Sequence, residues 1–135
     1  MDGKSIRLSE TERKVMRYIW SVRGPVMVSD IMEYFAREYQ KHYAASTVNT
    51  MLQRLIKKGY LAQGDKYIAF SGYEYHWVIS EEEYQRRQLS RYRDIDFEGS
   101  AGDLIVALLQ TQNISEQERI KIRECIDQLK AKEDR

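Results

Sequence analysis

Apolar residues recur at helical spacing in three stretches of the first half of the chain. A stripe with apolar residues at positions i, i+3, i+4 and i+7 places them on one face of a helix. The stripes predict helices from about Glu10 to Val22, behind Ser29, and from Ala45 to Gly59. Their apolar positions are Val15, Met16, Ile19 and Trp20 in the first, Ile31, Met32 and Phe35 in the second, and Val48, Met51, Leu52, Leu55 and Ile56 in the third.

Capping residues and helix breakers indicate where these helices begin and end. Ser9 and Glu12 have the Ser-x-x-Glu spacing of a capping box, and Gly24-Pro25 ends the first helix. Ser29 is predicted to cap the second helix. Between these two helices, the short apolar segment 25–28 is predicted to be extended.

After Gly59 the pattern changes from helical spacing to a run rich in Tyr, Phe, Trp and Ile. Turn residues at Gly64-Asp65 and Ser71-Gly72 predict a β-hairpin, with its second strand near Tyr73 to Ile79. The order helix, short strand, helix, turn, helix, hairpin is that of a winged helix-turn-helix, whose third helix enters the major groove of DNA. The predicted fold class is mainly α with a small β-hairpin.

The remainder of the chain predicts three more helices. Two of them begin with capping boxes, "SEEE" at Ser80 and "SEQE" at Ser115. The helix between them, "AGDLIVALLQ", is apolar almost all round and should be buried on more than one side. Cys125 lies on the apolar stripe of the last helix and is predicted to be a small buried hydrophobe rather than a redox sensor.

We therefore predict two domains, a winged helix at residues 1–79 and a helical region at residues 80–135. About 56 residues have difficulty burying their apolar surface alone, so we expect the second region to form a homodimer. The residues predicted at the dimer interface are Leu104, Ile105, Leu108, Ile122, Ile126 and Leu129.

The polar face of the third helix carries short hydrogen-bonding groups, then cations, and no acidic residue. Small hydroxylated residues at a helix N-terminus allow close approach to phosphate oxygens, and an Arg one or two turns later can reach a guanine edge or a phosphate. We predict DNA contacts from Ser46, Thr47, Thr50 and Arg54, and phosphate contacts from Lys57 and Lys58, with Lys66 or Tyr73 of the hairpin at the DNA backbone. The alternative is that Ser46 or Thr47 is only an N-cap and the rest is a solvated face.

Composition and charge agree with a DNA-binding role. Residues 1–79 carry twelve Lys and Arg against eight Asp and Glu, whereas residues 80–135 carry ten against thirteen. The longest apolar run has six residues, no secretory signal is visible, and a single cysteine fits a reducing cytoplasm, so we expect a cytoplasmic protein without a membrane segment. No residue cluster has the spacing of a metal site, a phosphate loop or a catalytic motif, so neither a metal nor a cofactor nor an enzymatic activity is expected.

The segment "STVNTMLQRLIKKGYL" resembles the T-V-x-T-x-L-x-R-L-x-K-K-G-x-L motif of the penicillinase-repressor family of winged-helix transcriptional repressors. "LSETERKVMRYIW", "YEYHWVISEEEY" and the C-terminal helices are similar to other parts of that family, so the resemblance covers nearly the whole chain. It implies a homodimeric bacterial repressor of a palindromic operator. By position, its operator contacts would be Ser46, Thr47, Asn49, Thr50 and Arg54, with the hairpin touching the DNA backbone.

The chain departs from the family's known release mechanisms. The copper-responsive branch ends in a C-x-C…C-x-C metal site, which this chain lacks. The branch that responds to β-lactams is cut by a sensor protease at an Asn-Phe bond, and the matching position here is Ala107-Leu108. A sensor protease stays a candidate partner, and release by proteolysis or by a ligand stays open. The alternative function is a winged-helix module for protein interaction without DNA binding, which should carry acids on the third helix.

Overall fold

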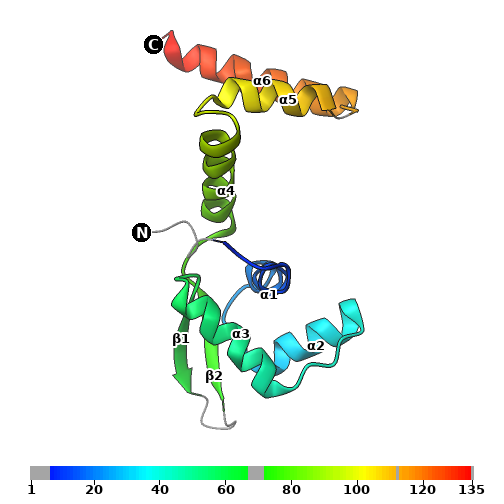
Figure 1. The fold of residues 1–135 in the computed structure, drawn as a ribbon, viewed down its shortest axis with the longest axis vertical. Coiled ribbons are helices and arrows are strands. Elements are labelled where there is room, and N and C mark those ends of the chain that lie inside the picture. Colours follow the sequence, from blue (N-terminus) through cyan, green and yellow to red (C-terminus); the bar gives the residue numbers. More distant parts are fainter. Residues whose placement is uncertain (1–6, 67–71, 112, 135) are drawn as a thin grey trace. The chain divides into compact units, whose positions relative to one another are not determined.

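A computed structural model describes residues 7–66, 72–111 and 113–134 of the chain (Figure 1). The elements follow the order α1 (Glu10–Ser21), α2 (Val28–Tyr39), α3 (Ala45–Lys57), β1 (Leu61–Lys66), β2 (Tyr73–Trp77), α4 (Glu81–Asp96), α5 (Ala101–Thr111) and α6 (Glu116–Glu133). This order confirms the predicted winged helix-turn-helix followed by a helical region. Two compact units divide the chain between Gln88 and Leu89, within α4.

The predicted apolar stripes of α1, α2 and α3 form the core of the N-terminal unit. The fully buried positions include Val15, Met16 and Ile19 of α1, Ile31 and Phe35 of α2, and Val48, Leu52 and Leu55 of α3. Burial of one such aliphatic side chain stabilises a fold by about 1.5–3 kcal/mol. The core therefore holds one face of α3 against the unit and leaves its other face outside.

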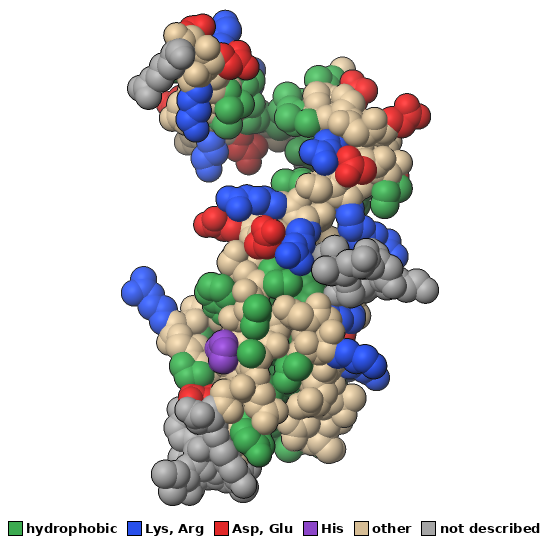
Figure 2. Space-filling view, turned by 90° about the vertical axis from the view of Figure 1, so that its left-hand side faces the viewer, with side chains coloured by type: hydrophobic (Ala, Val, Ile, Leu, Met, Phe, Trp, Pro, Cys, Tyr) green, Lys and Arg blue, Asp and Glu red, His purple; other side chains and the backbone are tan. Residues whose placement is uncertain are grey.

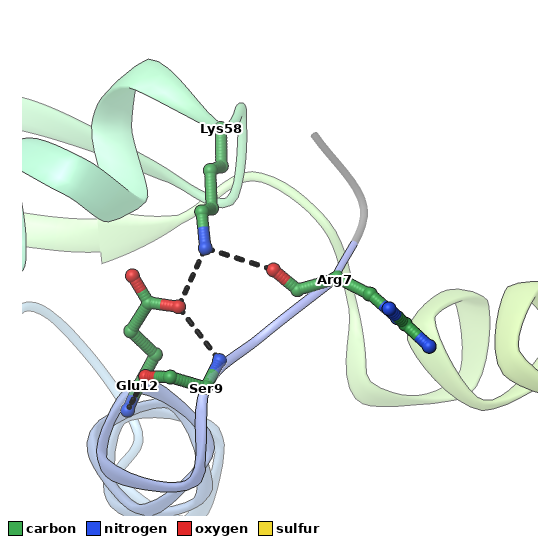
Figure 3. A network of polar contacts seen from close by, with 4 residues as sticks. All are labelled: Arg7, Ser9, Glu12 and Lys58. Carbon is green, nitrogen blue, oxygen red and sulfur yellow. Dashed lines mark hydrogen bonds and ion pairs between the residues drawn. The ribbon is translucent and has the colours of Figure 1, made fainter. Parts of the chain in front are cut away.

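A polar network around the buried Glu12 carboxylate ties the end of α3 to the start of α1 (Figure 3). The predicted capping box is present, because Ser9 Oγ accepts from the Glu12 N–H at 3.1 Å and Glu12 Oε1 accepts from the Ser9 N–H at 2.8 Å. Lys58 Nζ donates to the same Oε1 at 2.6 Å and to the Arg7 carbonyl at 2.8 Å. Burial raises the pKa of the Glu12 carboxyl, but the hydrogen bonds from Lys58 and Ser9 outweigh it and hold that pKa below its usual 4.5.

The start of α2 differs from the prediction that Ser29 caps it. The N-cap is Met27, and its N–H donates to Oδ2 of Asp30 at 2.8 Å. The helix begins early because Val26 forms a β-bridge with Tyr75, which fixes the chain as extended until immediately before Met27. Of the segment 25–28 that was predicted to be extended, Val26 pairs with the hairpin, whereas Val28 is already the first residue of α2.

The hairpin pairs β1 with β2 in antiparallel register, with Leu61 opposite Trp77 and Gln63 opposite Tyr75. The Gly64-Asp65 pair, predicted to be a turn, lies inside β1 instead. Because Gln63 pairs with Tyr75 and Lys66 with Tyr73, β1 has one more residue than β2 over this interval, which is a β-bulge. The second strand ends at Trp77, two residues before the predicted Ile79, and Ser71 of the other predicted turn lies outside the described residues.

The beginning of α4 packs against the winged helix. Tyr84 is buried beside Trp20, with ring centroids 5.3 Å apart, and the Trp20 indole N–H donates to the Ile79 carbonyl at 2.9 Å. The compact N-terminal unit therefore reaches nine residues further than the predicted boundary at Ile79. A fragment that ends at Ile79 would lose the Tyr84 ring from its core.

The C-terminal unit exposes apolar side chains at its surface (Figure 2). Among its described residues none is buried, so the prediction that α5 is buried on more than one side is wrong for the single chain. Cys125, predicted to be buried, is exposed as well, because the apolar stripe of α6 faces outward. None of the described helices has the length and apolar character needed to span a membrane.

Candidate nucleic-acid interface

Helix α3 presents an exposed face without acidic residues. Six of the side chains predicted to contact DNA are exposed on it: Ser46, Thr47, Asn49, Thr50, Arg54 and Lys57. Val48, Leu52 and Leu55, which lie opposite, are completely buried. This surface is neither packed against the described residues of the N-terminal unit nor neutralised by an acid of the same helix, so it is open to a polyanion.

The N-terminus of α3 is not capped by a side chain. Its N-cap residue is Ala44, whose carbonyl accepts from the N–H groups of Thr47 and Val48. Ser46 and Thr47 lie within the first turn, so the alternative that one of them is the N-cap is wrong. A helix start with small residues, free of acids, leaves backbone N–H groups and hydroxyls available to phosphate oxygens.

Further along the exposed face, Thr50 and the two cations occupy successive turns. The Thr50 hydroxyl donates to the Ser46 carbonyl at 3.0 Å, and its oxygen keeps the capacity to accept a hydrogen bond. Arg54 and Lys57 are exposed in the last turn. Their long side chains place positive charge at the end of α3, where they suit phosphate or guanine contacts.

Lys58 is not part of this surface, although the sequence predicted it as a phosphate contact. Its ammonium is committed to Glu12 and to the Arg7 carbonyl (Figure 3), and only 27% of its side chain is exposed. The sequence predicted phosphate contacts for both Lys57 and Lys58, because it does not show that the Lys58 ammonium meets Glu12 and the Arg7 carbonyl. For Lys66, the structure places the backbone at the end of β1, and the side chain lies outside the described part of the chain.

The side of α3 that faces the hairpin carries a hydrogen-bonded group that sequence analysis missed. The Tyr75 hydroxyl of β2 donates to Asn49 Oδ1, with 3.4 Å between the two oxygens. Burial raises the pKa of the Tyr75 phenol, the neighbouring Tyr73 raises it further, and a hydrogen bond from the Gln53 side chain partly offsets the rise. The Tyr75 ring lies in the core, and no sequence signal shows that its hydroxyl reaches α3.

A hollow of about 720 Å³ opens beside this group. It lies between the N-termini of α2 and α3 and the strand β2, and Asn49 and Tyr75 are among its lining residues. Two helix N-termini border this concave surface; the start of α2 carries the Asp30 carboxylate, which accepts from the Met27 N–H, whereas the start of α3 carries no acid. Among the described residues no group of three His, Cys, Asp or Glu side chains is arranged to hold a metal ion.

The fold and this surface define a winged-helix DNA-binding protein. Residues 8–128 match the model of the penicillinase repressor family, and the chain belongs to that family. It is 22% identical over 127 residues to the methicillin resistance regulatory protein MecI of Staphylococcus aureus strain N315, which covers 94% of this chain and 98% of the relative. The proteins of the same name from Staphylococcus epidermidis and Mammaliicoccus sciuri are 22% and 21% identical over the same shares. The chain is thus a transcriptional repressor of this family.

Proposed function

We propose that the protein is a homodimeric repressor that binds a palindromic operator by placing α3 in the major groove of each half-site. The observation that carries the proposal is the exposed, acid-free face of α3, with an uncapped N-terminus at one end and Arg54 and Lys57 at the other. The rival function, a protein-interaction module, would be favoured by acids on this face, and α3 has none.

Dimerisation is supported by the apolar surface of the C-terminal unit. Of the side chains predicted at the interface, Ile105, Leu108, Ile126 and Leu129 are 51–57% exposed, and Leu104 and Ile122 are half-buried. Each Å² of apolar surface removed from water contributes about 25 cal/mol, so a second copy of this unit would gain stability by covering them. A two-fold dimer would also match the symmetry of a palindrome.

The releasing signal is proposed to act on the C-terminal unit, by a sensor protease or by a ligand. Ala107 and Leu108, at the position where the related branch is cut, lie in the middle of α5. A protease needs an extended substrate, so cleavage there requires this helix to open locally. The neighbouring genes would distinguish the two routes, because a membrane sensor-protease encoded beside the repressor favours proteolysis.

Selection from a random duplex library with the full-length protein tests the proposed function. We expect enrichment of palindromic sequences whose half-sites are about one helical turn, roughly 34 Å, apart. On the enriched duplex, Arg54→Ala should weaken binding by about 1–3 kcal/mol. Arg13→Ala, an exposed cation of α1, is the matched control and should bind like the unaltered protein. Enrichment of no sequence would reject the proposal, and equal binding of the two variants would remove Arg54 from the interface.

A further inference from the structure

The hydrogen-bonded group between β2 and α3 bears on which bases the repressor selects. Asn49 is exposed on the flank of α3 that faces the hairpin, and its Oδ1 accepts from the buried Tyr75. Tyr75 is only 2% exposed and is held on both sides, by the β-bridge to Val26 and by pairing with Gln63.

A carboxamide has one acceptor end and one donor end, and a partner at one end determines which end faces outward. With Oδ1 of Asn49 turned to the Tyr75 hydroxyl, the two N–H groups of Nδ2 are the ones presented to a ligand. The flank of α3 that faces the hairpin therefore presents donors at Asn49.

On a free Asn side chain the donor and the acceptor together pair with N7 and N6 of adenine, which is the usual contact of this residue in the major groove. An Asn that offers only donors fits the acceptor atoms N7 and O6 of guanine or O4 of thymine instead.

We propose that Tyr75 is a positioning residue for base recognition: its hydroxyl orients Asn49 as a hydrogen-bond donor and thereby disfavours adenine at the base that Asn49 faces. This inference rests on the proposed operator binding by α3. Tyr75 itself touches no DNA in this account and acts through Asn49, so it adds a specificity determinant that lies in the wing strand and not on the recognition helix.

The test compares Tyr75→Phe with Tyr92→Phe in the full-length protein. Tyr75→Phe keeps the buried ring and removes only the hydroxyl, and Tyr92→Phe removes a hydroxyl from a 58% exposed ring of α4. Each variant is used to select duplexes from a random library. The unaltered protein and Tyr92→Phe should enrich guanine or thymine at one position of each half-site. Tyr75→Phe should admit adenine there, with the preference reduced about tenfold.

Two readouts separate orientation from simple loss of structure. Affinity for non-specific duplex at low salt should be equal for all three proteins, because phosphate contacts supply it. The side-chain amide NMR signals of Asn49 in the free protein should shift in Tyr75→Phe and stay in place in Tyr92→Phe. In an Asn49→Ala background, Tyr75→Phe should have no additional effect on the selected sequence.

The outcomes distinguish this inference from the proposed function. If the unaltered protein enriches a palindrome and Tyr75→Phe enriches the same bases with unshifted Asn49 signals, the orienting role is wrong and the repressor assignment stands. Adenine enriched opposite Asn49 by the unaltered protein would also overturn the inference. If the unaltered protein enriches no sequence, the proposed function fails and this inference fails with it.

Discussion

Single residues decide which cations of α3 are available to DNA. Lys57 and Lys58 are neighbours with the same chemistry, but Lys57 is exposed while Lys58 holds the buried carboxylate of Glu12. The same carboxylate completes the capping box of α1, so one acid serves a helix start and a contact 46 residues away in sequence. Packing of the apolar stripe against the core determines the direction of each side chain around α3. Lys57 is thereby left available to DNA, whereas Lys58 stabilises the fold.

Substitutions of the two lysines should therefore change different properties: DNA binding for Lys57 and the stability of the fold for Lys58. Lys57→Ala should leave the free energy of unfolding unchanged and lower the slope of log K against log salt by about 1 in DNA titrations. Lys58→Ala leaves Glu12 with an unpaired charge and should destabilise the fold by about 1–3 kcal/mol in urea unfolding. A loss of stability in Lys57→Ala, or none in Lys58→Ala, would contradict the assigned contacts.

The lowered pKa of Glu12 predicts how the N-terminal unit responds to acid. A carboxyl whose pKa is lower in the folded than in the unfolded chain contributes stability that is complete above the unfolded value, about 4.5, and is lost as pH falls below it. At pH 7, Glu12→Gln should therefore cost about 1–2 kcal/mol of unfolding free energy, and this difference should shrink towards pH 3.

The matched control for this pH dependence is Glu10→Gln. Glu10 lies on the same helix in an exposed pair with Lys14, with 84% of its side chain accessible. Such exposed pairs contribute little, so Glu10→Gln should change stability by less than about 0.5 kcal/mol at either pH. A gap between unaltered protein and Glu12→Gln that is the same at pH 7 and pH 3 would contradict the lowered pKa.

At the scale of elements, the sequence correctly predicted structural features that depend on neighbouring residues and missed features that depend on residues far away in sequence. The Ser caps of α1, α4 and α6 are confirmed, because a hydroxyl and an N–H three residues apart define them. The prediction that Ser29 caps α2 was wrong, because the β-bridge of Val26 to Tyr75, far away in sequence, sets the start of this helix. The prediction of a turn at Gly64-Asp65 was wrong, because β-bulges and turns favour the same residue types.

The end of α3 also depends on a local feature, the left-handed backbone of Gly59. Its φ is +88°, and a Cβ there would meet nothing within 4 Å, so only backbone strain opposes substitution. Gly59→Ala should cost about 1–2 kcal/mol in unfolding. Gly59→Asn should cost less, because Asn tolerates this conformation. Equal stability of Gly59→Ala and the unaltered protein would show that the turn can relax.

At the scale of the whole molecule, the sequence predicted apolar faces on α5 and α6 and assigned six of their residues to a dimer interface. The single chain leaves them exposed, because 135 residues in two units do not supply enough protein to cover them. The polar face of α3 was predictable from the sequence alone, since its stripe is regular. The hydrogen bond between the Tyr75 hydroxyl and Asn49 was not predictable, because it depends on the register of the strands that lie opposite α3.

Dimerisation through the C-terminal unit can be tested in the full-length chain. Leu129→Glu places a charge among the apolar side chains of α6 and should shift sedimentation from dimer to monomer, because a charge cannot be buried unpaired. Gln128→Glu adds the same charge at the neighbouring exposed position and should stay dimeric. A monomeric unaltered protein at micromolar concentration, or a dimeric Leu129→Glu, would contradict the assigned surface. DNA affinity should fall together with dimerisation.

The most direct test of the account is the affinity of Thr50→Glu for the duplex selected by the unaltered protein. Thr50 lies in the middle of the exposed face of α3, and a carboxylate there should meet the phosphates and lower affinity by about 100-fold or more, with an unchanged melting temperature. Gln85→Glu adds the same charge to an exposed position of α4 and should bind like the unaltered protein. If Thr50→Glu binds as tightly as Gln85→Glu, α3 does not lie against DNA and the account is wrong.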